Sequence, residues 1–100
     1  MLLYNVTYGI DQDAEAEWLK YMREHHIQSV MNTGMFVDHK MYRVLHDQET
    51  DTISYSVQYF ARTIEDVQRY LEEYAPALVE EHRKRFHNRH VAFMTLLDEV

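Results

Sequence analysis

The sequence predicts an α+β fold in which strands and helices follow the order strand, helix, strand, strand, helix, strand. Residues 2–10 alternate apolar and polar side chains with the period of two that a half-buried strand shows. From Ala14 to Val30 the apolar side chains recur instead at helical spacing, and Gly34 follows where a left-handed residue would end the helix. The 100 residues, 46% of them apolar and 27% charged, suffice for one hydrophobic core, so we expect a single domain over residues 1–100.

The rest of the chain supplies the other four elements. Residues 35–46 and 53–61 are predicted strands joined by an acidic connection, and residues 90–97 form a fourth strand. A second helix begins after Thr63, whose hydroxyl can cap it. Pro76 breaks this helix into two pieces, because proline fits the first turn of a helix but not its interior.

Two right-handed βαβ units in this order give a ferredoxin-like βαββαβ topology. The expected sheet is four-stranded and antiparallel, with both helices on one face and the first and third strands at its centre. Tyrosines recur on one face of those two central strands, and this more apolar face should meet the helices. They are Tyr4, Tyr8, Tyr55 and Tyr59.

The charge and composition argue against several classes of function. Ten basic against seventeen acidic residues give a net charge of −7, which would repel nucleic acid and anionic membranes at long range. No apolar stretch is long enough to span a membrane, and the first residues lack the basic and apolar regions of a secretion signal. The absence of cysteine rules out disulfides and thiolate metal sites and fits a cytoplasmic location.

Two histidines are the sharpest candidates for chemistry, because each falls inside the apolar stripe of a helix. His26 lies in the middle of the first helix and His82 in the second piece of the other, and both helices cover the same sheet face. The two imidazoles could therefore converge on one pocket as catalytic residues, where partial burial would keep them neutral. The alternative is that each is a core histidine whose ring nitrogens bond to a carbonyl, a tyrosine hydroxyl or water.

The other histidines carry weaker signals and are expected at the edge of a stripe or on the surface. They are His25, His39, His46, His87 and His90. Several histidines crowd the end of the second helix, but their spacing matches no known zinc signature. We therefore expect no metal site, and the sequence identifies no cofactor.

The predicted sheet shares its topology with RNA-recognition motifs, which place base-stacking aromatic residues on the same strands. The third strand, TISYSVQYFA, lacks the basic residue and the glycines of that motif, and the net charge has the wrong sign. Aromatic packing against the helices is the better interpretation. If that packing leaves a pocket between sheet and helices, Tyr4, Tyr55 and Trp18 would form its aromatic walls.

Two stretches, EWLKYMREHHIQSVMNTGMF (Glu17–Phe36) and YLEEYAPALVEEHRKRF (Tyr70–Phe86), resemble an uncharacterised bacterial domain-of-unknown-function family. With the opening YNVT and the VQYFA of the third strand, the likeness covers nearly the whole chain. The family is similar to the dimeric α/β-barrel group, in which two ferredoxin-like sheets pair face to face. This resemblance implies a homodimer. The wider group contains cofactor-free oxygenases, haem-degrading enzymes and plain ligand-binding proteins.

The opposite face of the sheet carries small polar side chains, among them Asn5, Thr7, Ser56 and Gln58. Such a face can simply remain in water. In the dimer that the resemblance implies, it would instead form a polar interface held by hydrogen bonds between subunits and by trapped water.

The leading hypothesis is a small-molecule-binding protein of the dimeric α/β-barrel type, with a small hydrophobic or aromatic ligand between sheet and helices. By analogy with the wider group, an enzyme of this kind would be an oxygenase or isomerase with His26 as its base. The rival hypothesis is a non-catalytic interaction or regulatory module, in which the histidines are structural and the dimer surface is the function. A cavity that touches both His26 and His82 would favour the first hypothesis over the second.

Overall fold

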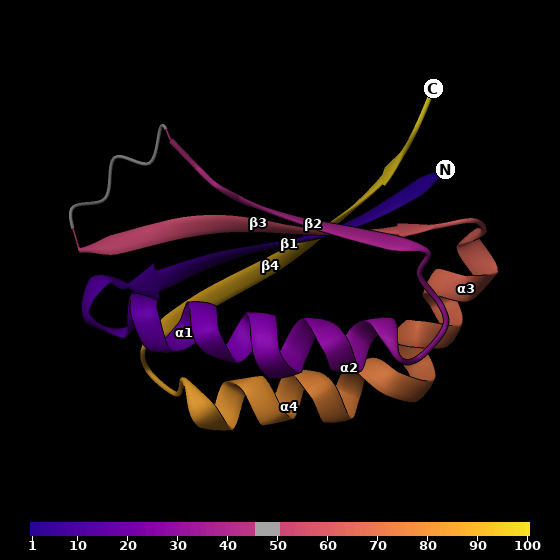
Figure 1. Ribbon diagram of the computed structural model, residues 1–100. Coiled ribbons are helices and arrows are strands. Elements are labelled where there is room, and N and C mark those ends of the chain that lie inside the picture. The colour runs from indigo at the N-terminus through magenta and orange to yellow at the C-terminus, as the bar shows by residue number, and fades with distance from the viewer. Residues whose placement is uncertain (46–50) are drawn as a thin grey trace.

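The computed structural model describes residues 1–45 and 51–100 and contains an antiparallel sheet covered on one face by helices (Figure 1). The strands are β1 (Leu2–Asp11), β2 (Asp38–Arg43), β3 (Thr52–Ala61) and β4 (His90–Asp98). They lie in the order β2-β3-β1-β4, so the first and third strands are central. The ferredoxin-like βαββαβ fold predicted from the sequence is confirmed.

Two helical stretches cover the sheet, and each contains a π-helical segment. The first runs from a 3-10 turn (Gln12–Ala14) through α1 (Glu15–Tyr21) and a π-helical segment (Met22–His26) into α2 (Ile27–Met31). The second comprises α3 (Ile64–Arg69), a π-helical segment (Tyr70–Tyr74) and α4 (Ala75–Arg85), with Pro76 in the first turn of α4 as predicted. Within the described residues, no helix has both the length and the apolar surface that crossing a bilayer would require.

Aromatic side chains fill the layer between the sheet and the helices. On the helix-facing side of the sheet, Tyr4 pairs across the strands with Tyr59, and Tyr8 pairs with Tyr55. All four side chains are buried, as is Trp18, which reaches them from α1. The tyrosine face of the sheet therefore meets the helices, as the sequence indicated.

The second strand is shorter than predicted. It starts at Asp38, later than expected, because Phe36 turns into the core and stacks 5.9 Å from the ring of Tyr4. Gly34 adopts a positive φ of 78° before it and ends the first helix as predicted. The end of the predicted strand and most of the acidic connection, residues 46–50, lie outside the described residues.

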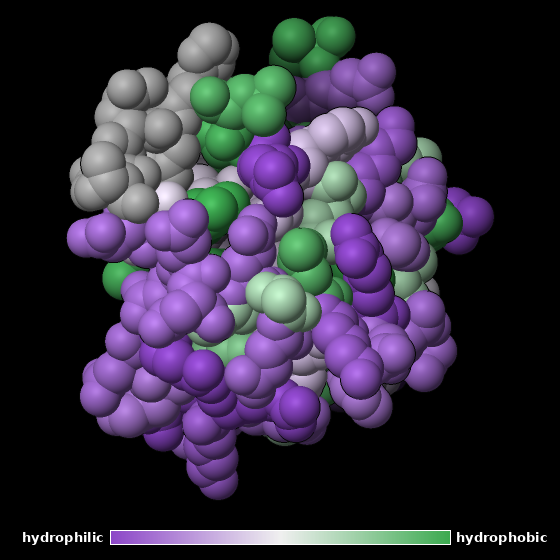
Figure 2. Space-filling model, turned by 60° about the vertical axis from the view of Figure 1, so that its left-hand side comes forward, coloured by the Kyte–Doolittle hydropathy of each residue, from purple (hydrophilic) through white to green (hydrophobic). Residues whose placement is uncertain are grey.

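Strand β4 is an edge strand with little cover on either face. Large apolar side chains on both of its sides stay exposed, namely Val91, Phe93, Met94, Leu96 and Leu97. By contrast, hydrophilic side chains cover most of the lower part of Figure 2, where the helices lie. An edge strand with exposed apolar side chains is a common site for contact with another molecule.

Replacing Thr63 with alanine should lower the free energy of unfolding by about 1 kcal/mol. The Thr63 hydroxyl accepts a hydrogen bond from the backbone N–H of Asp66 at 3.2 Å, and alanine leaves that N–H without its cap. Urea denaturation followed by circular dichroism measures the loss. Thr63→Ser keeps the hydroxyl and should stay near the wild type, so an equal loss in both variants would contradict the capping role.

Candidate functional site

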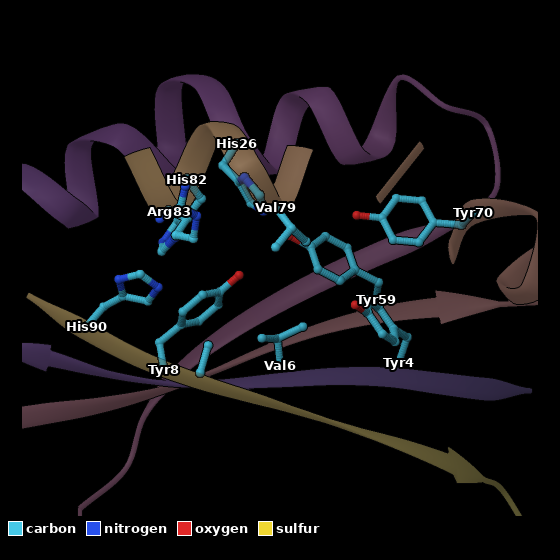
Figure 3. Close-up of a pocket in the computed structure, with 11 residues that line it drawn as sticks. Tyr4, Val6, Tyr8, His26, Tyr59, Tyr70, Val79, His82, Arg83 and His90 are labelled. Carbon is cyan, nitrogen blue, oxygen red and sulfur yellow. The ribbon is translucent and has the colours of Figure 1, made fainter. Parts of the chain in front are cut away.

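A cavity of about 240 Å³ lies between the helices and the sheet, on the side where α4 and β4 run (Figure 3). Its lining comes from three strands and both helical layers, and consists of Tyr4, Val6, Tyr8, His26, Tyr59, Tyr70, Val79, His82, Arg83, His90 and Ala92. In Figure 3 Tyr4, Tyr8 and Tyr59 rise from the sheet, whereas Tyr70, His26 and His82 come from the helices. Hydroxyls and imidazoles therefore face the same space. A wider hollow, beside Asp11, Gln12, Asp13 and Asp51, is open to solvent and offers no comparable set of buried groups.

The structure brings His26 and His82 into this one cavity. Their ring centroids lie 5.5 Å apart in an edge-to-face arrangement, and the side chains are only 5% and 3% exposed. His26 is the last residue of the first π-helical segment, and Tyr70, the first residue of the second, lines the same cavity. A π-helical turn shifts the direction of the side chains that follow it, and such turns are frequent at functional sites.

Trp18 holds His82 in place through a buried hydrogen bond. The indole Nε1–H donates to His82 Nε2 at 2.9 Å. Because an indole N–H can only donate, Nε2 is the unprotonated nitrogen and neutral His82 carries its proton on Nδ1. Trp18 itself is fully buried behind the imidazole and lies outside the lining of the cavity.

Burial keeps both histidines uncharged near neutral pH. Removal from water disfavours the imidazolium form and lowers the pKa of His26 to about 4. The pKa of His82 falls to about 3, chiefly through the same desolvation and further through the nearby imidazoles of His26 and His90. Neutral imidazoles offer one donor and one acceptor each, so both rings can bind polar groups of an uncharged molecule.

Four tyrosine hydroxyls on the cavity wall make no hydrogen bond with any described residue. They belong to Tyr4, Tyr8, Tyr59 and Tyr70. The Tyr59 hydroxyl is the extreme case, since it is buried from solvent and still has no partner among the described residues. Burial raises the pKa of Tyr59 well above its usual value, so the group stays a neutral phenol. A buried hydroxyl in this state costs about 1–3 kcal/mol.

His90 also belongs to the cavity, and its predicted place on the surface was wrong. Its ring centroid lies 4.7 Å from that of His82, and its Nδ1 contacts the carbonyl oxygen of Phe86 at 2.9 Å. His90 begins β4 opposite Ile10 on the helix-facing side of the sheet, a placement that only the strand register reveals. Even so, no three metal-ligating side chains gather closely enough to hold an ion within residues 1–45 and 51–100.

Tyr4 lines the cavity, whereas Trp18 and Tyr55 stand behind its wall. Tyr55 packs against Trp18 with ring centroids 5.0 Å apart, and its hydroxyl donates to the carboxylate of Glu15. Arg43 donates to the same hydroxyl at 3.3 Å. The Tyr55 hydroxyl is therefore fully engaged, unlike the hydroxyls that face the cavity.

The polar residues expected at a dimer interface lie on the outer face of the sheet, away from the cavity. Asn5 links them within the subunit, because its amide donates to Thr7 at 3.0 Å and its carbonyl accepts from Ser56 at 2.5 Å. Gln58 donates in turn to Ser56 at 3.3 Å. Exposed apolar side chains of β4 border this polar centre, so the face is more apolar than predicted from the sequence.

Residues 1–100 match the family described as "Domain of unknown function (DUF4286)". The chain belongs to this family. No curated protein matches the DUF4286 chain.

Several solved structures share the fold of the DUF4286 chain over its whole length. MhuD with two manganese protoporphyrin IX molecules bound per active site aligns with a TM-score of 0.73 and 18% identity, over 100% of this chain and 95% of that one. An antibiotic biosynthesis monooxygenase aligns with a TM-score of 0.67 and 18% identity, over 100% and 99%. SnoaB, a cofactor-independent oxygenase from Streptomyces nogalater, aligns with a TM-score of 0.65 and 13% identity, over 98% and 92%. These identities establish the fold alone, which is ferredoxin-like.

Acidification should destabilise the protein before most carboxylates titrate. The pKa values of His26 and His82, about 4 and about 3, lie below the ordinary 6.5, so between these values the unfolded chain binds more protons than the folded one. Stability is therefore full above the ordinary pKa and falls as the pH drops, by roughly 1.4 kcal/mol per pH unit for each histidine.

Urea denaturation at a series of pH values from about 7 to about 5 measures this slope. His26→Gln should reduce the slope, whereas the exposed His25→Gln should leave it unchanged. A slope that stays the same in His26→Gln would show that this imidazole does not titrate as a buried group.

Proposed function

We propose that this protein binds a small, neutral aromatic molecule in the cavity between its helices and its sheet. The observation that carries the proposal is the Tyr59 hydroxyl, which is buried without a partner among the described residues on the wall that His26 and His82 also line. Buried polar groups are nearly always hydrogen-bonded in folded proteins. Because this hydroxyl is covered in the free protein, a side-chain shift on binding would let a hydroxyl or carbonyl group of the ligand supply the missing partner.

The volume of the cavity supports a ligand of one or two rings. Pockets for drug-sized molecules usually measure about 300–1,000 Å³, and this cavity holds about 240 Å³. A porphyrin of the kind bound in MhuD is larger than such a molecule, so the cavity does not fit it. We therefore derive no haem chemistry from the likeness to MhuD.

The charges around the cavity support an uncharged ligand. Arg83 is the permanently charged side chain in the lining, and its charge is paired with Glu80, to which Nε and one Nη donate at 2.9 and 2.6 Å. Burial keeps His26 and His82 neutral, as their lowered pKa values show. An anion in this cavity would lose its hydration without gaining a free cation, which is unfavourable.

Packing between tilted aromatic rings supports the aromatic character of the ligand. Tyr8 lies 5.0 Å from His82 between ring centroids, and Tyr4 lies 5.7 Å from Tyr70. These flat side chains form most of the cavity wall. Aromatic pairs gain about 0.5–1.5 kcal/mol beyond the area they bury, so a planar ring would be favoured over an aliphatic chain of equal size.

A second candidate function is an oxygenase- or isomerase-like reaction on the bound molecule. His26 favours it, because this neutral ring has no hydrogen-bond partner among the described residues and can accept a proton from a ligand hydroxyl. That transfer breaks the O–H bond, leaves an oxyanion on the ligand and creates an imidazolium beside it. The attraction between these two charges has to offset the burial that lowers the pKa of His26. The description of SnoaB as a cofactor-independent oxygenase supports this candidate by analogy of fold.

Tyr59→Phe should raise the free energy of unfolding by about 1 kcal/mol and weaken ligand binding at the same time. Phenylalanine removes the unpartnered buried hydroxyl and keeps the ring, so the free protein gains stability while the ligand loses a hydrogen bond. Urea denaturation measures the first effect. Isothermal titration with 1-naphthol measures the second, and we expect a roughly 5- to 10-fold weaker affinity.

Tyr55→Phe is the matched control on the same strand. Its hydroxyl is bonded to Glu15 and Arg43, so its loss should destabilise the protein and leave the affinity for 1-naphthol unchanged. Failure of 1-naphthol to bind the wild-type protein, together with a loss of stability in Tyr59→Phe, would refute the proposed function.

We also infer that two subunits pair through the outer face of the sheet. This face joins the polar centre at Asn5 and Ser56 to apolar side chains of β4, and Val91 and Phe93 there are 70% and 64% exposed. Exposed apolar area of this kind is unfavourable in water and typical of an interface core. The resemblance to the dimeric α/β-barrel group supports the same arrangement.

Phe93→Lys should convert the dimer to a monomer. A two-fold interface joins the same surface of both subunits, so the substitution places two lysine charges in it. Burying these charges without partners is unfavourable. Sedimentation velocity at micromolar concentration measures the change. Ile64→Lys is the control, because it replaces an apolar side chain that is 39% exposed on helix α3, away from the outer face of the sheet. This variant should leave the dimer intact. A wild-type protein that sediments as a monomer would contradict the inference.

A further inference from the structure

We propose that Trp18 is a positioning residue: it fixes His82 as a hydrogen-bond donor, beside His90 as an acceptor, and thereby selects ligands that carry both a carbonyl and a hydroxyl group. This inference rests on the proposed function, since it needs a ligand in the cavity. It adds the chemical class of that ligand, with His82 as the hydrogen-bond donor and His90 as the acceptor.

The direction of the Trp18 hydrogen bond decides what His82 can offer. The indole Nε1–H lies 2.9 Å from His82 Nε2, so Nε2 gives its lone pair and Nδ1 carries the proton. That Nδ1–H has no partner among the described residues, and the ring lines the cavity. His82 therefore presents a donor to the ligand. It cannot act as a base, because a proton added to Nε2 would oppose the indole N–H.

The carbonyl of Phe86 gives His90 the opposite role toward the ligand, that of a hydrogen-bond acceptor. Nδ1 of His90 lies 2.9 Å from that oxygen, which can only accept, so Nδ1 carries the proton. In the neutral ring Nε2 then keeps a free lone pair. Figure 3 shows the His90 ring beside Tyr8 at the edge of the cavity, and His90 thus presents an acceptor to the ligand.

Of the other polar groups in the cavity, Arg83 can only donate but is paired with Glu80, and the remaining groups impose no direction. A phenol hydroxyl rotates about its C–O bond and can donate or accept, which applies to the four tyrosines of the lining. His26 has no hydrogen-bond partner among the described residues that would select one of its tautomers. Among the imidazoles and phenols of the wall, discrimination between donors and acceptors on a ligand therefore depends on His82 and His90.

These two imidazoles are close neighbours, with ring centroids 4.7 Å apart. A ligand that satisfies both needs an acceptor for His82 and a donor for His90 at a similar separation. An aromatic ring with a carbonyl group and a hydroxyl group in meta positions meets this requirement without a charge. A simple phenol or a simple ketone satisfies one imidazole and leaves the other without a partner, which weakens binding.

Nuclear magnetic resonance of isotope-labelled histidine tests the assignment without any ligand. A two-bond proton–nitrogen correlation spectrum near pH 8 identifies the ring nitrogen that carries the proton in a neutral imidazole. We expect the Nδ1–H form in His82 and His90, with the exposed His25 as the unconstrained reference. In Trp18→Phe, which keeps an aromatic ring but lacks the indole N–H, His82 should lose its single tautomer. A wild-type His82 protonated on Nε2 would overturn the proposal.

Isothermal titration with three matched probes tests the ligand class. The probes are meta-hydroxyacetophenone, acetophenone and meta-ethylphenol. We expect the first to bind roughly 5- to 10-fold more tightly than either of the others, the gain from one additional neutral hydrogen bond. Equal affinities would overturn this inference and leave the proposed function standing, provided that 1-naphthol binds. If no aromatic probe binds at all, the proposed function fails and this inference fails with it.

His82→Asn and His82→Leu separate the donor from the shape of the side chain, and they give a result even if Trp18→Phe does not fold. Asparagine carries an N–H donor near the position of Nδ1, whereas leucine has none. The preference for meta-hydroxyacetophenone should survive in His82→Asn and disappear in His82→Leu. A preference that persists in His82→Leu would assign the selectivity to other groups and overturn the proposal.

Discussion

The hydrogen bond from Trp18 to His82 is the interaction on which the rest of the interior depends. It joins the first helical layer to α4 at 2.9 Å, across 64 positions of sequence, between two side chains that are almost fully buried. Loss of either partner would leave the other with an unsatisfied polar atom in the core, which costs more than the net gain of the bond itself. The bond therefore fixes the position of α4 over the sheet, and with it the width of the cavity.

The interior combines aromatic bulk with polar groups that a purely apolar core would avoid. Tyr8 and Trp18 pack 5.2 Å apart between ring centroids, and this contact supports the cavity wall from the sheet side. Phenylalanine would fill the tyrosine positions equally well, without hydroxyls that lack partners. The protein thus keeps a feature that lowers its stability, and such features are common where a protein binds another molecule.

The fold and the two principal histidines could be predicted from the sequence because both follow from periodicity. The alternation of apolar and polar residues predicted the tyrosine face of the central strands. Helical spacing predicted that His26 and His82 face the core, where both are buried. Tyr70 and His90 could not be assigned to the cavity in this way. Tyr70 follows Val67 at helical spacing and lies on the apolar side of its helix, but that spacing does not distinguish a core position from one on the cavity wall. His90 starts a strand, where a shift of one residue would have reversed its direction.

The turn before β4 determines which face His90 takes, and so links the cavity to the outer face of the sheet. Asn88 adopts a positive φ of 64°, and the backbone N–H of Asp11 donates to the carbonyl of Arg89 at 3.1 Å, which anchors the strand against β1. With this register, His90 faces the helices and Val91 faces outward. A slip of one position would exchange them and place an imidazole on the apolar outer face. One short turn therefore sets the chemistry of both surfaces, although the proposed ligand binding and the proposed subunit pairing use opposite sides of the strand.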